Sequence, residues 1–474
     1  GAGDYYGLAA LAPWIDFSTN SILPSTGPDV HAAVGELLME SLSSFYVAGD
    51  GRANENFGLT TVHHVFHEDH NVQLVNLEKS VFEQTTVAAD LQKWMVAVSD
   101  SSNHSSNANV GFTGGHYVAT GGVLALIQGG VNDGELVVVA ADATGPALAS
   151  AGGGTHSYIL TDADGRAIGA ANAFTNADGI VSWNQDTLFN ATKLMVEMEY
   201  QHVAIDQYAR LITPDLPEFV TYDATIQADI SVEYAQAAFR FGHSQLRDSI
   251  DALDPSNVVT GNILHYALEA AFLNPQAFAS VGPSDLVMGM THQAMNETDE
   301  FVTPALQQTL LGQPLDLAAI NIARGRDLGI PTLNETRKAL YDALVAERAA
   351  GGTGTQIHAK LQLDQLKPYN SWSDFESSIM HKGSIVNFIA AYSFDGNLAK
   401  AQLVYDLSHG VTLTDSDNSL NAGLNWSATD AINFMSNNVG GKIAGADGYN
   451  SVDLWIGGLA ESHVIGGQLG YTFN

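Results

Sequence analysis

Apolar residues recur at helical spacing along most of this chain, and this pattern limits its fold more than any other feature. They do so over residues 30–45, over residues 59–77 and, with few interruptions, from Thr187 to the C-terminus. A helix with this spacing has an apolar stripe along one side, which it must bury against another element. The sequence therefore predicts a mainly α-helical body.

The pattern changes between about Gly111 and Ser182. Short β-prone runs, such as residues 137–140 and 158–160, alternate there with turns rich in Gly, Asn and Asp. We therefore predict a small β-rich insertion at residues 101–181, which separates an N-terminal part of the helical domain, residues 1–100, from a C-terminal part, residues 182–474. Two Asp- and Asn-rich stretches in the insertion lack the bidentate glutamate of a calcium loop, so hairpin turns are favoured.

The composition excludes several classes of protein. With 52 acidic and 18 basic residues the net charge is -34, which repels the phosphates of nucleic acids and anionic membrane surfaces. No stretch is long and apolar enough for a membrane span. The chain has no cysteine, so a metal must use His, carboxylate or carbonyl ligands. This composition is typical of a secreted bacterial protein, and we expect an extracellular location.

Two segments concentrate groups suited to binding an anion and a metal. Residues 318–331 begin with apolar residues and contain two arginines, an asparagine and an aspartate within a short stretch. About 80 residues earlier, His243 is predicted late in an apolar helix, with Arg240 one turn before it on the same face. A lone histidine in that position is more often a core residue than a ligand, so the two segments have to be considered together.

Together these segments resemble two motifs of the animal-type haem peroxidases, the peroxidase-cyclooxygenase superfamily. Residues 321–331 resemble the signature Asn-x-x-Arg-[Gly/Ser]-Arg-Asp-x-Gly-[Leu/Ile]-Pro, and residues 239–243 resemble the proximal motif Phe-Arg-[Phe/Tyr]-Gly-His. The resemblance implies that His243 binds the haem iron, that Asn321 accepts a hydrogen bond from its other ring nitrogen, and that Arg324 pairs with a haem propionate. It also places Arg240 among the cofactor-binding residues.

The opposite side of the haem is expected near the N-terminus. Residues 48–56 resemble the family segment Ala-Gly-Asp-x-Arg-x-x-Glu, and residues 59–71 resemble the helix that follows it. Arg52 then matches the distal arginine, whose charge stabilises the leaving oxygen as the O–O bond breaks. Glu55 matches a carboxylate that forms an ester with a haem methyl in several relatives. The expected cofactor is haem b, ester-linked through Glu55.

The sequence offers two further candidate metal sites, one for calcium and one for zinc. Residues 11–18 resemble the family's calcium loop, with Trp14, Asp16 and Ser18 as ligands, although Ala12 replaces the usual threonine. Four histidines at helical spacing offer zinc as an alternative, but they do not form the pattern His-Glu-x-x-His. They are His63, His64, His67 and His70. Calcium is the expected second metal, and the histidines are interpreted as structural.

The family's distal histidine, which lies in an Asp-His-Asp-like segment before the calcium loop, has no match here. The first residues also lack the pattern of a signal peptide, so we expect further polypeptide segments upstream and downstream. The resemblance, which is strongest to peroxidase domains of large secreted bacterial proteins, implies oxidation of halide, thiocyanate or phenols by hydrogen peroxide. One alternative is a structural or adhesive extracellular protein with little turnover. Another is a fatty-acid dioxygenase, but Arg240 occupies the position of its radical tyrosine.

Overall fold

The computed structural model describes residues 45–46, 52–84, 94 and 184–474, and gives the backbone alone for short strands between residues 15 and 183. Within residues 184–474 it has gaps at residues 217, 220, 222–223, 226–227, 255–262, 309, 311–312, 351–362 and 439–442. The chain divides into two compact units. One comprises residues Gly1–Thr61 and Ala204–Asn474, and the other comprises Val62–Val203.

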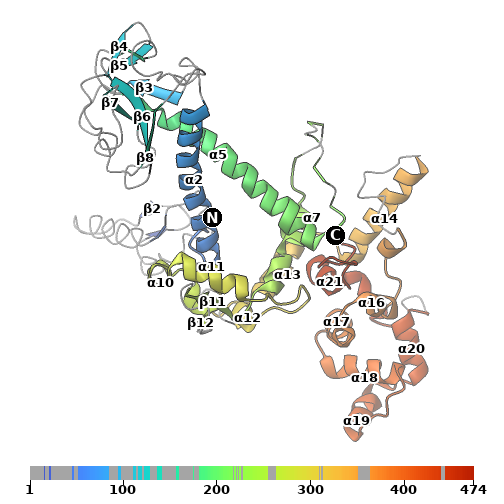
Figure 1. Ribbon diagram of the computed structural model, residues 1–474. Helices are drawn as coiled ribbons and strands as arrows, with labels where there is room; N and C mark the ends of the chain where they lie inside the picture. The colour runs from blue at the N-terminus through green and yellow to red at the C-terminus, as the bar shows by residue number, and fades with distance from the viewer. Residues whose placement is uncertain are drawn as a thin grey trace. The chain divides into compact units, whose positions relative to one another are not determined.

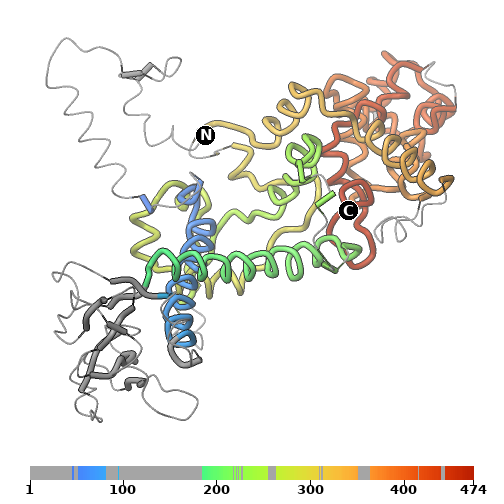
Figure 2. The backbone as a smooth tube through the Cα atoms, turned by 90° about the horizontal axis from the view of Figure 1, so that it is seen from above, coloured from blue at the N-terminus to red at the C-terminus, as the bar shows by residue number. Residues whose placement is uncertain are grey.

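The unit Val62–Val203 is built on two long helices and a set of short strands. Helix α2 (Phe57–Gln84) begins in the other unit and continues into this one, which confirms the helix predicted over residues 59–77 (Figure 2). Helix α5 (Gln185–Gln201) packs against it, with the rings of Phe66 and Tyr200 5.1 Å apart. The side chain of Asn184 caps the start of α5 by accepting from the Thr187 N–H.

The β-prone runs of the sequence do form strands. Strand β6 (Gly122–Gln128) lies between β7 (Leu136–Ala140) and β8 (His156–Ile159), and both pairings are antiparallel. A second sheet has the order β4-β5-β9, and β3 pairs with β10. These five strands span Val110–Thr113 (β4), His116–Ala119 (β5), Phe174–Thr175 (β9), Met95–Ala97 (β3) and Val181–Trp183 (β10). The limits of the insertion, residues 101–181, remain a prediction.

The C-terminal part of the larger unit consists mainly of helices (Figure 1). They pack around an aromatic and aliphatic core. Trp372, Phe375, Ile389 and Phe434 are almost completely buried in it. The helices are α14 (Leu333–Ala349), α16 (Trp372–Ser378), α17 (Ile385–Ser393), α18 (Leu398–Ser408), α19 (Asp415–Leu424), α20 (Ala428–Ser436) and α21 (Leu454–Ala460), with 3-10 turns η8 (Leu363–Leu366), η9 (Lys382–Ser384) and η10 (Gly448–Ser451). The mainly helical character predicted from the sequence is confirmed.

A second, smaller core lies around a β-hairpin that the sequence analysis did not predict. Strands β11 (Ser249–Leu253) and β12 (Ile263–Ala267) pair antiparallel, and β11 packs against α11 (Pro283–His292). The helices α9 (Leu268–Ala271), α10 (Pro275–Val281), α12 (Pro304–Gln308) and the start of α13 (Leu317–Asp327) contribute to this core. Helix α6 (Arg210–Ile212) follows the π-helix η4 (His202–Ala209), and the carbonyl of Ile212 accepts from the N–H of Gln468. No helix among the described residues combines the length and apolar character that crossing a membrane requires.

Gly289 allows α11 to approach the hairpin closely, because a Cβ atom there would lie 2.0 Å from the carbonyl oxygen of Asp251. We expect Gly289→Ala to lower the free energy of unfolding by about 1–3 kcal/mol, the usual cost of overpacking. Gly423 in α19 is the control, because its Cβ would meet nothing within 4 Å. Gly423→Ala should be neutral or stabilising. Urea denaturation of both variants tests this, and equal stabilities would contradict it.

Candidate functional site

The segment that carries His243 consists of three short helical pieces instead of the single apolar helix that was predicted. They are α7 (Val232–Gln236), the 3-10 turn η5 (Ala238–Phe241) and α8 (Gly242–Gln245). The backbone leaves helical geometry at Ala237, with φ -122° and ψ -76°. Three residues after this break, the carbonyl of Arg240 accepts from the indole N–H of Trp455 at 3.3 Å. The expected helix is therefore corrected to a broken one.

Asn321 connects Arg240 and His243. Its Oδ1 accepts from the guanidinium of Arg240 at 2.5 Å, and its Nδ2 lies 2.8 Å from Nδ1 of His243. Arg240 also donates to Oε1 of Gln236. Asn321 is only 1% exposed, so these contacts are shielded from water. The structure thus brings Asn321 together with Arg240 and His243, which lie 81 and 78 positions earlier in the sequence.

The amide of Asn321 presents Oδ1 to Arg240 and Nδ2 to His243. The resemblance implied that Oδ1 accepts a hydrogen bond from His243. In the structure Oδ1 accepts from Arg240, whose guanidinium can only donate. Nδ2 therefore faces the ring, and Nδ1 of His243 acts as the acceptor. A half-turn of the amide would place Oδ1 against an Nδ1–H group and leave the lone pair of Nε2 free for a metal. That half-turn requires Arg240 to give up its bond to Oδ1.

Burial lowers the pKa of His243 to about 4, and the positive charge of Arg240 adds to this effect. The imidazole is therefore neutral at neutral pH, which is the form that ligates a metal. Burial and the charge of Arg324 lower the pKa of Arg240 as well. Arg324 is exposed, and within the described part of the chain it forms no ion pair. Two guanidinium groups near a neutral imidazole suit a ligand that carries carboxylates.

Helix α13, which carries Asn321, is held near its C-terminal end by an ion pair that the sequence analysis did not predict. Arg326 donates to Asp453 through two bonds, from Nε at 2.9 Å and from a terminal nitrogen at 2.6 Å. Tyr392 donates to the same carboxylate at 2.7 Å. Hydrogen bonding to Asp453 raises the pKa of Arg326. The only signal in the sequence was that both residues lie in stretches that carry the family resemblance.

Arg52 and Glu55 lie in a turn before α2. The turn is closed by a bond from the Glu55 N–H to the carbonyl of Arg52, 2.8 Å long. The carbonyl of Glu55 accepts from the Leu273 N–H at 3.0 Å, and Asn56 forms a bridge with Phe272. The turn is therefore attached to the segment that follows the β11–β12 hairpin. That Arg52 and Glu55 face a haem bound by His243 remains a prediction.

The other predicted metal ligands are not brought together by the described residues. Trp14 and Ser18 lie outside them, as do residues 30–44 of the helix predicted over residues 30–45, the two Asp- and Asn-rich stretches of the insertion and residues 351–355. Asp16 is described only as backbone, in strand β1 (Ile15–Asp16), which pairs with β2 (Ser21–Ile22). The histidines of α2 form no cluster of three metal-ligating groups among the described side chains. The zinc alternative therefore gains no support.

Comparisons with known proteins show what this chain is similar to. The profile of the animal haem peroxidases matches residues 177–350. Peroxinectin A of Dictyostelium discoideum is 27% identical over 201 residues, which are 42% of this chain and 36% of that protein. The human peroxidasin homolog is 33% identical over 167 residues, which are 33% of this chain and 11% of that protein.

Among solved structures, peroxidase A from Dictyostelium discoideum has a TM-score of 0.38 and 21% identity, covering 61% of this chain and 41% of its own. The chain thus spans well under half of each of these relatives. The residues matched by the family profile include Arg240, His243, Asn321 and Arg324. Residues 177–350 of this chain therefore match the animal haem peroxidase family.

Proposed function

We propose that this chain binds haem b and acts as a peroxidase, which uses hydrogen peroxide to oxidise a small reductant such as halide, thiocyanate or a phenol. The observation that carries the proposal is the contact of Asn321 with both Arg240 and His243, inside the stretch that the family profile matches. The acidic, cysteine-free composition supports an extracellular location.

The residues present fit a haem once the amide of Asn321 makes the half-turn described above, which puts the ring proton of His243 on Nδ1 and frees Nε2. His243 is neutral at neutral pH, so it can act as the axial ligand. Arg324 is exposed and, within the described residues, free of ion pairs, so its guanidinium can bind a propionate. Glu55 is proposed as the carboxylate that forms an ester with the haem. Haem, when bound, would supply the iron at which peroxide is reduced.

The protein's own residues have defined tasks in this proposal. Asn321 and Arg240 hold the ring of His243 in one orientation. Arg52 would hold a positive charge where negative charge develops on the departing oxygen. A base must also move a proton between the two peroxide oxygens, which contributes roughly 100- to 10,000-fold in rate. We propose that this base is a histidine in a polypeptide segment beyond these 474 residues, and that calcium is held by Trp14, Asp16 and Ser18.

The test is an absorption spectrum of the purified chain, before and after hydrogen peroxide is added, with a colorimetric reductant present. A Soret band that shifts with peroxide and recovers as the reductant is consumed is the expected result. A Soret band without turnover would favour an extracellular structural or adhesive protein that keeps the fold. Absence of a Soret band after reconstitution with haem would contradict the haem assignment.

Replacement of Asn321 tests the arrangement around His243 directly. We expect Asn321→Ala to weaken haem affinity by about 10- to 100-fold, because outer partners of a metal-bound histidine have effects of that size. Asn418→Ala is the control, since this asparagine is exposed in helix α19. Titration of the haem-free protein with haem, followed by absorbance, measures both. An unchanged affinity in Asn321→Ala would show that the asparagine does not support the ligand.

A further inference from the structure

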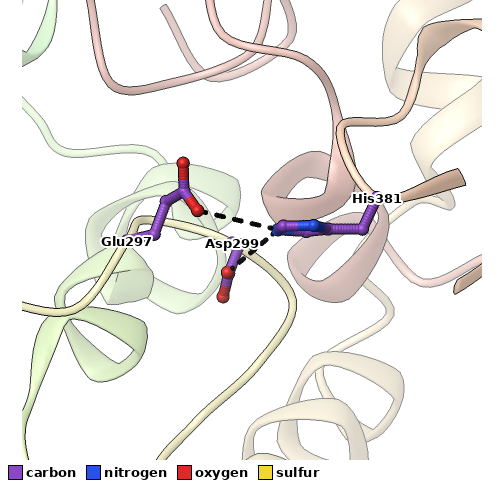
Figure 3. Close-up of side chains that lie close together, drawn as sticks. All are labelled: Glu297, Asp299 and His381. Carbon is purple, nitrogen blue, oxygen red and sulfur yellow. Dashed lines mark hydrogen bonds and ion pairs between the residues drawn. The ribbon is translucent and has the colours of Figure 1, made fainter. Parts of the chain in front are cut away.

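Three metal-ligating side chains converge outside the haem site (Figure 3). Glu297 and Asp299 come from the segment between α11 and α12, and His381 precedes the 3-10 turn η9. Nε2 of His381 lies 3.2 Å from Oδ2 of Asp299 and 3.9 Å from Oε2 of Glu297. One ligand atom from each residue lies within 4.8 Å of the others. Two atoms bound to a tetrahedral zinc ion are about 3.4 Å apart, so small side-chain movements would suffice for coordination.

The surrounding contacts hold Asp299 and His381 in place. Oδ1 of Asp299 accepts from the backbone N–H of Phe301 at 2.8 Å, which turns Oδ2 toward His381. The ring of Phe301 packs edge-on against the ring of His381, with centroids 5.4 Å apart. The N–H of Met380 donates to the carbonyl of Ala460 at 2.8 Å, and this anchors the residue before His381 to α21. Ligands held in this way lose less entropy when they bind an ion.

The electrostatic environment favours a cation. Glu300, which follows Asp299 in the sequence, accepts through one carboxylate oxygen from the hydroxyl of Ser384. Its other carboxylate oxygen is buried with no partner among the described residues. The neighbouring Lys382 does not neutralise these carboxylates, because its ammonium donates to three backbone carbonyls near the end of α16.

An independent observation comes from the cavity beside the cluster. Its volume is about 330 Å³, and both Glu297 and Asp299 line it. Thr303 lines the same cavity and is only 4% exposed. Its hydroxyl has no hydrogen-bond partner within the part of the chain that the structure describes. Buried hydroxyl groups are normally bonded, and a water molecule carried by a metal ion would be a suitable partner.

We propose that Glu297, Asp299 and His381 bind a divalent transition-metal ion, with zinc as the ion that fits best. One imidazole and two carboxylates suit zinc, whereas calcium and magnesium prefer oxygen ligands alone. The three residues leave a fourth position for water on the side of the cavity. The site does not depend on haem binding. The segment that carries Glu297 and Asp299 nevertheless contacts the segment that carries His243. The backbone N–H of Asn296 donates to the carbonyl of Gln245, two residues after His243.

Calorimetric titration of the full 474-residue chain with zinc chloride, after dialysis against a chelator, tests the site. We expect one zinc ion per chain, and we expect His381→Gln and Glu297→Gln each to weaken its affinity by more than about tenfold. Glu297 has a side chain that is 59% exposed, so its replacement should leave the fold intact. His409→Gln is the matched control. It too lies near a carboxylate, 3.8 Å from Glu376, but belongs to no cluster of three ligands among the described residues.

The possible results separate the alternatives. Lack of zinc binding by the unchanged chain would show that the cluster is only an ion pair between side chains. Zinc binding that persists at full affinity in both His381→Gln and Glu297→Gln would place the ion elsewhere, for example on the histidines of α2, and would also overturn the proposal. Binding of calcium in preference to zinc would contradict the assignment of the metal. Loss of zinc affinity in these two variants, with the control unchanged, would establish the site whether or not the protein takes up haem.

Discussion

His243→Ala is expected to remove specific haem binding from this protein. The substitution deletes the one neutral imidazole that Asn321 and Arg240 hold in place. Loss of an outer partner of a metal ligand already costs about 10- to 100-fold in affinity, so loss of the ligand itself should cost more. The measurement is a haem titration of the haem-free variant, with the position of the Soret band as a second readout.

Imidazole in solution provides the control for this experiment. His243→Gly leaves room for an imidazole molecule at the same place, and we expect added imidazole to restore the Soret position of the unchanged protein. Such a rescue separates loss of the ligand from loss of the fold. Unchanged haem affinity in His243→Ala would show that another residue is the axial ligand, and the proposed function would need revision.

The second large effect is expected at a buried ion pair in the C-terminal body. Arg337 and Glu461 lie 2.5 Å apart, with side chains only 4% and 3% exposed. Arg337 also donates to the carbonyl of Lys367 and to the hydroxyl of Thr472, and its guanidinium lies 4.1 Å from the centroid of the Tyr369 ring. Arg337→Met would leave the carboxylate of Glu461 buried without its cation. We expect a loss of about 3–5 kcal/mol in the free energy of unfolding.

Thermal denaturation gives the measurement, and a drop in Tm of roughly 6–20 °C corresponds to that loss. Lys338→Met is the control from the next position of the same helix. Its ammonium pairs with Asp342, but these side chains are 65% and 56% exposed. Exposed pairs contribute about 0–1 kcal/mol, so its Tm should hardly change. Similar values for the two variants would show that Tyr369 and Thr472, which also donate to Glu461, satisfy the carboxylate alone.

The sequence predicted the members of the candidate site better than its geometry. Asn321 and His243 carry motifs, so their proximity could be expected from the resemblance. The direction of the Asn321 amide could not, because it depends on competition with Arg240 for one oxygen. The break at Ala237 was also missed, since helical periodicity does not show where the backbone leaves helical geometry. The contact of Trp455 with the carbonyl of Arg240 was equally hidden, because 215 positions separate the two residues.

The same distinction holds for the fold. Helix α2 was predictable because its apolar spacing is regular over many turns. The β11–β12 hairpin was missed because it is short and stands within a helical context, and strand β12 shows no regular alternation of buried and exposed residues. The cluster of Glu297, Asp299 and His381 has no motif at all, since more than 80 residues separate the carboxylates from the histidine. Contacts of this kind become visible only when the chain is folded.

The contacts of Arg326 with Asp453 and of Trp455 with Arg240 have a consequence for biosynthesis. The bond between Trp455 and Arg240 spans 215 positions, and the pair of Arg326 and Asp453 spans 127. Contacts so distant in sequence form slowly, because a long loop must close before they stabilise anything. On the ribosome, the pocket around His243 can be completed only after residue 455 has left the exit tunnel. Cofactor uptake should therefore follow translation of nearly all of these 474 residues, and nascent chains released before that point should lack a finished pocket.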